Sequence, residues 1–129
     1  MNLAHLTLLF AGICALIHFA LTGLVIMRRV QARVDLLDGG DVILLRRIRA
    51  HGNFSETAPM ALLLLALLEL HGLSPTWLWG LGVGLVVGRV LHAWSLLTNN
   101  ARWNRRGGIA LTLAVLSVQG VLCIWIYLR

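Results

Sequence analysis

Four stretches of about 20 residues, almost free of charged side chains, constrain the fold of this chain more than any other feature. An α-helix rises about 1.5 Å per residue, so roughly 20 apolar residues cross a hydrocarbon core about 30 Å thick. The chain is 59% hydrophobic and 12% charged, which leaves too few polar side chains to cover the surface of a water-soluble protein. The sequence therefore predicts an all-α integral membrane protein.

The expected helices cover residues 3–27, 46–71, 75–97 and 109–128, and they form a single four-helix transmembrane domain over residues 1–129. Gly72 suits the C-terminal cap of the second helix, and Pro75 suits the first turn of the third. The first stretch lacks the basic start and the small-residue cleavage site of a signal peptide, so we expect it to remain as a membrane helix. Cys14 and Cys123 lie in different stretches and form no CxxC pair, so no metal site is expected.

The arginines predict the orientation of the chain, because basic residues in short loops stay on the cytoplasmic side of a membrane. Nine of the 11 basic residues lie in or beside the first and third connections. They are Arg28, Arg29, Arg33, Arg46, Arg47, Arg49, Arg102, Arg105 and Arg106. We therefore expect loops 28–46 and 98–107 in the cytoplasm, with both termini outside it. The net charge of +6 follows from this topology, and no nucleic-acid partner is expected.

Polar residues at the start of the second helix share a face. Arg49, Asn53 and Glu56 stand at i, i+4 and i+7, within about 60° of each other on a helical wheel. His51 points about 200° away, toward a different neighbour. On the third helix, Arg89 and His92 lie one turn apart on a single face.

Glu56 and Arg89 are expected to reach a similar depth in the membrane. By the helical rise, Glu56 lies about 10 Å beyond Arg49, and Arg89 lies about 13 Å before the end of its helix. An unpaired charge at the centre of a membrane helix costs at least about 2.5 to 3.5 kcal/mol, so an ion pair between the two residues is the economical arrangement. That pair could serve only to hold two helices together. The additional polar groups at the same level favour a binding site.

A site made of arginines, one carboxylate and one amide matches a small, zwitterionic ligand with a net negative charge. Pro59 removes one backbone hydrogen bond just past this cluster and suits a kink that widens the site, although membrane helices also tolerate proline without any such role. Gly80, Gly84 and Gly88 recur every four residues on the third helix and allow a close approach of another helix.

The segment "RAHGNFSETAP", followed by "GRVLH" on the third helix and "RRGG" before the fourth, resembles the MAPEG family, the membrane-associated proteins in eicosanoid and glutathione metabolism. The likeness covers essentially the whole chain and is greatest to the short bacterial branch. It implies a four-helix bundle that assembles as a homotrimer in the bacterial inner membrane, with glutathione as co-substrate bound between subunits.

The resemblance also implies roles for single residues. Glutathione would be held by Arg49, Asn53, Glu56 and Arg89 of one subunit, with His92 close by, and by His51 and either Arg28 or Arg29 of its neighbour. Arg105 would be the catalytic residue that stabilises the glutathione thiolate. Thr57 and Leu96 stand where many members of the family have tyrosine, and this puts the catalytic rate in doubt more than the fold.

Three functions remain open at this point. The first is a glutathione transferase or peroxidase that directs the thiolate at a small lipophilic electrophile or hydroperoxide arriving from the membrane lipids. The second is a non-catalytic lipid-binding or scaffold protein, which Arg105 disfavours. The third is a multidrug transporter driven by an intramembrane carboxylate, which needs Glu56 to be unpaired.

Overall fold

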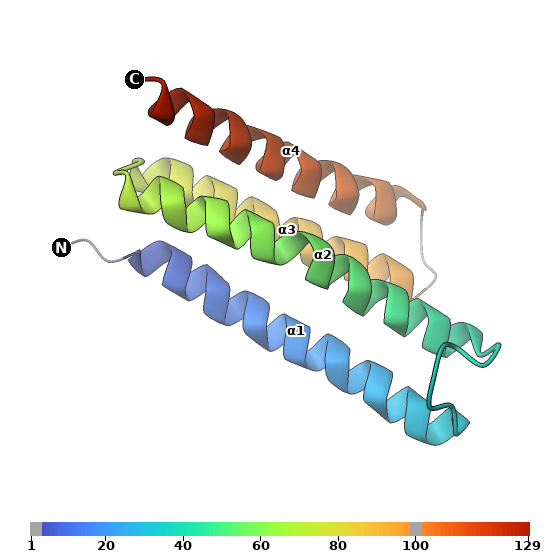
Figure 1. The fold of residues 1–129 in the computed structure, drawn as a ribbon. Coiled ribbons are helices and arrows are strands. Elements are labelled where there is room, and N and C mark those ends of the chain that lie inside the picture. Colours follow the sequence, from blue (N-terminus) through green and yellow to red (C-terminus); the bar gives the residue numbers. More distant parts are fainter. Residues whose placement is uncertain (1–3, 99–101) are drawn as a thin grey trace.

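The computed structural model of the chain contains four helices and confirms the all-α fold (Figure 1). They are α1 (His5–Ala32), α2 (Val42–Leu70), α3 (Pro75–Thr98) and α4 (Arg102–Tyr127). The structure describes residues 4–98 and 102–129, and for 102–105 it describes the backbone alone. All four helices are long and apolar enough to span a membrane.

The two inner helices, α2 and α3, separate the two outer ones (Figure 1). Helix α1 packs against α2 and α3, and α4 packs against the same two helices from the other side. Between the described residues, α1 and α4 make no contact. Any site built inside the bundle therefore draws its side chains mainly from α2 and α3, with additions from one outer helix.

Both expected connections between the first three helices form for local reasons. Gly72 has φ +80°, and its N–H and that of Leu73 donate to the carbonyls of Glu69 and Leu68, which closes the C-terminus of α2. Pro75 begins α3, as predicted. In the first connection, Gly39 and Gly40 have positive φ and make the expected turn.

Helix α2 begins at Val42 and not at residue 46, because Asp41 caps its N-terminus. The Asp41 carboxylate accepts a hydrogen bond of 2.7 Å from the N–H of Leu44. Helix α1 likewise continues beyond residue 27 and ends where Arg33 adopts a left-handed conformation with φ 55°. The apolar composition that marks the membrane span thus ends before the helices do.

A glutamate at the far end of α2 caps α1. Glu69 accepts hydrogen bonds from the N–H groups of Leu6, at 2.9 Å, and Thr7, at 2.7 Å. The first N–H groups of a helix have no partner within the helix and carry partial positive charge, so a carboxylate is a favourable acceptor. This contact fixes the start of α1 against the end of α2.

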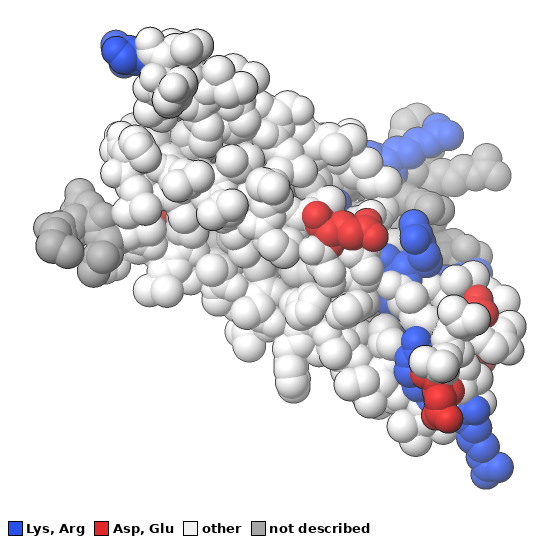
Figure 2. Space-filling model, in the orientation of Figure 1, with Lys and Arg blue, Asp and Glu red and all other residues white. Residues whose placement is uncertain are grey.

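Most of the basic groups of the bundle lie at one end. Figure 2 shows Arg side chains mostly at the end that holds the connection between α1 and α2, beside a largely uncharged flank. A single basic group lies at the opposite end in this view, where the chain terminates (Figures 1 and 2). This distribution fits the asymmetry of the sequence on which the predicted orientation rests.

Candidate functional site

Arg89 is the centre of a polar cluster that joins three helices. Its guanidinium lies inside the bundle, where the residue is 2% exposed. Nη1 donates to the side-chain oxygen of Asn53 at 2.6 Å and to the hydroxyl of Thr57 at 2.8 Å, both on α2. Nε donates to the hydroxyl of Thr112 on α4 at 3.0 Å. We call Arg89, Asn53, Thr57 and Thr112 the arginine cluster.

The hydroxyl groups of the arginine cluster are themselves tied to the backbone. Thr57 donates to the carbonyl of Asn53 at 2.9 Å, and Thr112 donates to the carbonyl of Gly108 at 2.9 Å. Each hydroxyl therefore presents a lone pair to Arg89. Sequence reasoning missed both threonines as partners of Arg89, although Thr57 stands one turn after Asn53 on the same face of α2.

The predicted ion pair between Glu56 and Arg89 is wrong for the single chain. Glu56 is exposed on the surface of α2, and the described residues contain one salt bridge, between Arg28 and Asp41. At 100° per residue, the direction midway between Asn53 and Thr57 lies about 80° from Glu56. Arg89 lies on the Asn53 and Thr57 side, so the two charges at similar depth do not meet.

Small residues bring α3 and α4 close together beside the arginine cluster. A Cβ atom placed on Gly108 would lie 2.7 Å from the backbone nitrogen of His92 and 2.8 Å from the carbonyl oxygen of Gly88. Similarly, a Cβ on Gly84 would lie 3.0 Å from Val115. The predicted close approach is confirmed for Gly84 and Gly88, whereas Gly80 has open space beside it.

His51 faces α1 and not α3, as its position on the helical wheel predicts. Its ring lies against that of His18, with centroids 4.7 Å apart and planes inclined by 37°. Asn53, two residues later, contacts α3 through Arg89. Within one subunit, these polar side chains of α2 therefore point in two separate directions, His51 toward α1 and Asn53 toward α3. Helix α2 continues through Pro59 without interruption.

The arginines of the first connection bind neighbouring parts of the same chain. Arg28 forms the salt bridge with Asp41 at 2.7 Å, and Arg29 donates to the carbonyl of Leu37 at 2.9 Å. Arg47 donates to the carbonyl of Leu24 and so joins α2 to α1. The Arg28 guanidinium, assisted by the N–H of Leu44, lowers the pKa of Asp41.

The remaining site residues named from the sequence lie at the arginine-rich end or outside the described side chains. Arg49 is exposed, and His92 is buried one turn after Arg89 on α3. Arg105 belongs to α4, but its side chain lies outside the described residues. Leu96 is half-buried and packs on the apolar core. Among the described residues, no group of three or more His, Cys, Asp or Glu side chains could hold a metal ion.

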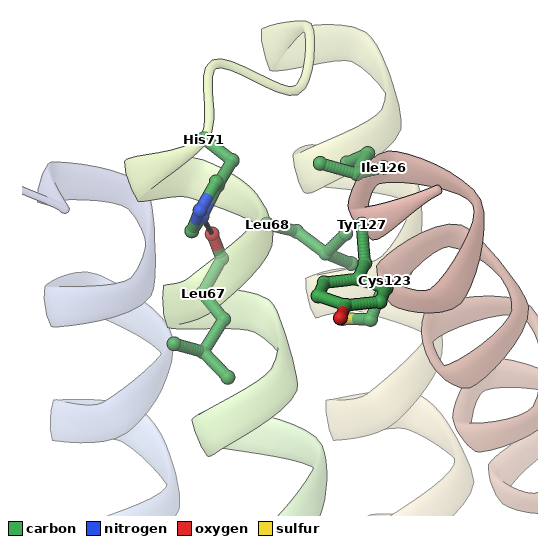
Figure 3. A pocket seen from close by; sticks show the side chains of 6 residues that line it. All are labelled: Leu67, Leu68, His71, Cys123, Ile126 and Tyr127. Carbon is green, nitrogen blue, oxygen red and sulfur yellow. Dashed lines mark hydrogen bonds between the residues drawn. The ribbon is translucent and has the colours of Figure 1, made fainter. Parts of the chain in front are cut away.

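Two cavities flank α2, and neither contains the arginine cluster. One of about 280 Å³ lies between α1 and α2 and is lined by His18, Cys14 and Phe54 among others. The other, of about 250 Å³, lies between the far ends of α2 and α4 (Figure 3). There the ring of His71 turns back along α2 to the carbonyl of Leu67, while Cys123 and Tyr127 reach in from α4. No site residue named from the sequence lines this second cavity.

The fold and the arginine cluster define a class of protein. It is a four-helix membrane protein in which a guanidinium inside the bundle donates hydrogen bonds to neutral acceptors. The model of the MAPEG family matches residues 7–125, and the chain belongs to this family. It is 33% identical over 118 residues to the inner membrane protein YecN of Escherichia coli strain K12. That match covers 91% of this chain and 88% of the relative, and the YecN protein of Escherichia coli O6:H1 gives the same values. No solved structure matches the chain.

Proposed function

We propose that this protein is a glutathione-dependent membrane enzyme of the transferase or peroxidase type, which activates the glutathione thiol toward lipophilic electrophiles or hydroperoxides. The family contains glutathione-dependent enzymes, and this chain carries the charged residues of the motif by which the resemblance was identified. The observation that carries the proposal is the buried charge of Arg89. Its described partners are the neutral oxygens of Asn53, Thr57 and Thr112, with no carboxylate within ion-pair distance.

A buried cation without a counter-ion favours the binding of an anion nearby. Removing a charge from water is expensive, and neutral hydrogen-bond acceptors return only part of that free energy. Glutathione carries two carboxylates and one ammonium at neutral pH, so it brings the net negative charge that the cluster lacks. The carboxylate of Glu56 matches the ammonium group, and the exposed guanidinium of Arg49 matches a carboxylate.

The exposed charges of α2 support a homotrimer in which the site is completed by a neighbouring subunit. Glu56 lies at the middle of α2 (Val42–Leu70) and is exposed in the single chain. A carboxylate facing lipid at that level would cost about 2.5 to 3.5 kcal/mol. A neighbouring subunit and its ligand would remove this cost. His51, which faces away from the arginine cluster, would then serve the neighbour's site, as would Arg28 or Arg29.

In the proposed reaction, Arg105 acts on the sulfur of glutathione. A guanidinium stays protonated at neutral pH and cannot act as a base, so it favours the thiolate electrostatically while the proton leaves to water. The thiolate then attacks the electrophilic carbon of a conjugation substrate, forming a C–S bond as the leaving group departs or an epoxide ring opens. With a hydroperoxide it attacks the outer oxygen, the O–O bond breaks and the alcohol leaves, which converts glutathione to its sulfenic acid. The thiol of a second glutathione then attacks that sulfur and forms the disulfide with release of water.

Binding is tested by calorimetry with reduced glutathione on the purified full-length protein in detergent. We expect saturable binding that weakens at least tenfold in Arg49→Gln and Glu56→Gln. The control is Arg33→Gln, which changes an exposed arginine outside the proposed site. Absence of saturable binding by the unaltered protein would overturn the proposal.

The catalytic role of Arg105 is tested against its neighbour Arg106, which is exposed. Arg105→Ala should raise the pH at which bound glutathione forms the thiolate, followed by ultraviolet absorbance, and should reduce conjugation of a model electrophile while affinity stays within about tenfold. Arg106→Ala should change neither, because one residue turns a helical side chain by about 100°. If both variants form thiolate and turn over like the parent, Arg105 is not the catalytic residue, and if the parent itself neither forms thiolate nor turns over, the non-catalytic scaffold function replaces the enzymatic one.

We also propose the bacterial inner membrane as the location, because the similar YecN proteins are inner membrane proteins by name. Segments 28–46 and 98–107, expected from the sequence as loops, would face the cytoplasm and both termini the opposite side. In a chain without its native Cys14 and Cys123, a cysteine at Leu36 should be protected from an impermeant thiol reagent in intact cells, and one at Ser74 should react. Equal labelling of the two positions would contradict this topology.

A further inference from the structure

We propose that the cavity between the far ends of α2 and α4 binds one copper(I) ion, held by the thiolate of Cys123 and the imidazole of His71. The cavity measures about 250 Å³ and lies at the end of the bundle opposite the connection between α1 and α2 (Figures 1 and 3). None of its lining residues belongs to the proposed glutathione site, so copper binding does not depend on the proposed function.

His71 presents one ring nitrogen that is suited to bind a metal ion. Its Nδ1 lies 2.8 Å from the carbonyl oxygen of Leu67. A carbonyl only accepts hydrogen bonds, so in the neutral ring the proton is on Nδ1 and Nε2 carries a lone pair. Metal-binding histidines usually donate their other ring N–H to a carbonyl or a carboxylate in this way. His71 is exposed, so an ion can reach it from outside the bundle.

Cys123 supplies a free thiol from the other side of the same cavity. Figure 3 shows its sulfur on the α4 side and the ring of His71 on the α2 side. A volume of about 250 Å³ corresponds to a sphere about 8 Å across, and bonds from a metal ion to nitrogen and sulfur measure about 2.0 to 2.3 Å. The two donor atoms must therefore approach to about 4 Å, which rotation of the two side chains within the cavity allows.

A buried amide next to this thiol lacks a hydrogen-bond partner. Gln119 is 0% exposed, one turn before Cys123, and neither atom of its amide has a partner within the described part of the chain. Helical side chains lean toward the N-terminus, so the sulfur of Cys123 lies over the turn that contains Gln119. An unpaired amide inside the bundle is costly. A thiolate at Cys123 offers the amide N–H a stronger acceptor than the neutral thiol does.

The donors and their charge favour copper(I) over zinc. Thiolate and imidazole suit both metals. A structural zinc site requires four ligands, and the described residues contain no group of three or more His, Cys, Asp or Glu side chains that could supply them. Copper(I) is satisfied by a linear pair of donors. When it binds, the thiol proton leaves to water, and the thiolate cancels the single positive charge of the ion. The site then carries no net charge among the apolar side chains of Leu67, Leu68 and Ile126.

The cavity between α1 and α2 contains the same two donor types but disfavours a cation. Cys14 and His18 line it, and Cys14 is 2% exposed. The positive charge of Arg89 acts on the Cys14 thiol, so a metal ion bound there would be repelled. Cys14→Ser and His18→Gln are therefore matched controls, because each removes the same donor type from the same chain outside the proposed copper site.

The test titrates copper(I) without air and without glutathione into the metal-free, full-length protein in detergent, against the coloured chelator bicinchoninate. We expect one ion per chain, with an affinity that falls about a hundredfold in Cys123→Ser and about tenfold in His71→Gln. Gln119→Leu should weaken binding severalfold. The two matched controls should bind like the parent, and so should Tyr127→Phe, because the phenol in this cavity is a hard oxygen donor.

A measurement on the unaltered protein keeps the proposal testable if a variant fails to fold. Copper(I) should protect Cys123 from alkylation by a maleimide, located by mass spectrometry of the digested protein, whereas zinc at the same concentration should not. Labelling of Cys14 should be the same with and without copper. Absence of copper binding, binding that persists in Cys123→Ser, or equal protection of Cys123 by zinc would overturn the proposal.

Discussion

Replacing Gly108 by alanine should destabilise the protein, whereas the same change at Gly107 should stabilise it. Both glycines lie in α4, so both variants gain the helical preference of alanine, about 1 kcal/mol. The surroundings differ. A Cβ on Gly107 meets nothing within 4 Å, but on Gly108 it lies 2.7 Å from the nitrogen of His92 and 2.8 Å from the oxygen of Gly88.

The difference between these two variants isolates the packing of α3 against α4. Ordinary contact begins near 3.4 Å, so the helices must separate by about 3.4 − 2.7 = 0.7 Å. Because both contacted atoms belong to the backbone of α3, no side chain can move aside. Overpacking of this kind costs about 1 to 3 kcal/mol. We expect the Gly108→Ala melting temperature to fall several degrees below that of Gly107→Ala, measured by tryptophan fluorescence in one detergent.

The same separation should weaken the arginine cluster. Thr112 stands one turn after Gly108 and moves with it, which lengthens the 3.0 Å hydrogen bond from Arg89. Glutathione affinity should therefore fall in Gly108→Ala and remain at the parental value in Gly107→Ala. Equal melting temperatures for the two variants would refute the reasoning, because the close backbone contact would then not exist in the protein.

Two further predictions concern the ends of the helices. Glu69→Gln should lower the free energy of unfolding by about 1 to 2 kcal/mol and speed hydrogen exchange at Leu6 and Thr7. The reason is that an amide offers those N–H groups one neutral acceptor in place of a carboxylate. Unchanged exchange at both backbone amides would contradict the cap. The salt bridge with Arg28 lowers the pKa of Asp41 in the folded protein. The salt bridge therefore stabilises the protein fully at a pH above the unfolded pKa of about 3.9, and this stabilisation disappears as the pH falls through the lower folded pKa. Asp41→Asn, which keeps a capping oxygen, should remove this acid step from the melting temperature measured against pH, and an identical profile in the variant would exclude the pair as its source.

The sequence was sufficient for the number and order of the helices and for the direction of several side chains, although α4 begins at Arg102 and not at the expected residue 109. Length and composition predicted four spans, and Gly72 and Pro75 predicted the tight turn between α2 and α3. The 200° between His51 and the face of Arg49 predicted that His51 meets a different helix from Asn53. These features depend on local geometry alone, which the order of residues determines directly. Asp41 was a capping signal of the same local kind, and attention to it would have located the start of α2.

The partner of Arg89 could not be predicted in the same way. Matching depths along two helices gives one coordinate, but a contact also requires the rotation of each helix about its axis. In a soluble bundle the apolar stripe indicates that rotation, whereas α2 is apolar on most of its circumference and leaves it undetermined. A rotation that directs Asn53 and Thr57 toward α3 turns Glu56 outward. Thr112 was harder still, since its place depends on how closely Gly108 lets α4 approach.

The failure of the ion pair changes what the two charges imply. If Glu56 and Arg89 formed an ion pair, each charge would already have its counter-ion within the single chain. Neither residue would then require a ligand or a neighbouring subunit. Instead, Arg89 is held rigidly by neutral oxygens inside the bundle, and Glu56 stands on the outside of the same helix that supplies two of those oxygens. A ligand with both charges could engage Glu56 through its ammonium and respond to the field of Arg89 through its carboxylates. The two residues would then be coupled through the ligand, so their interaction belongs to binding and not to folding of the single chain.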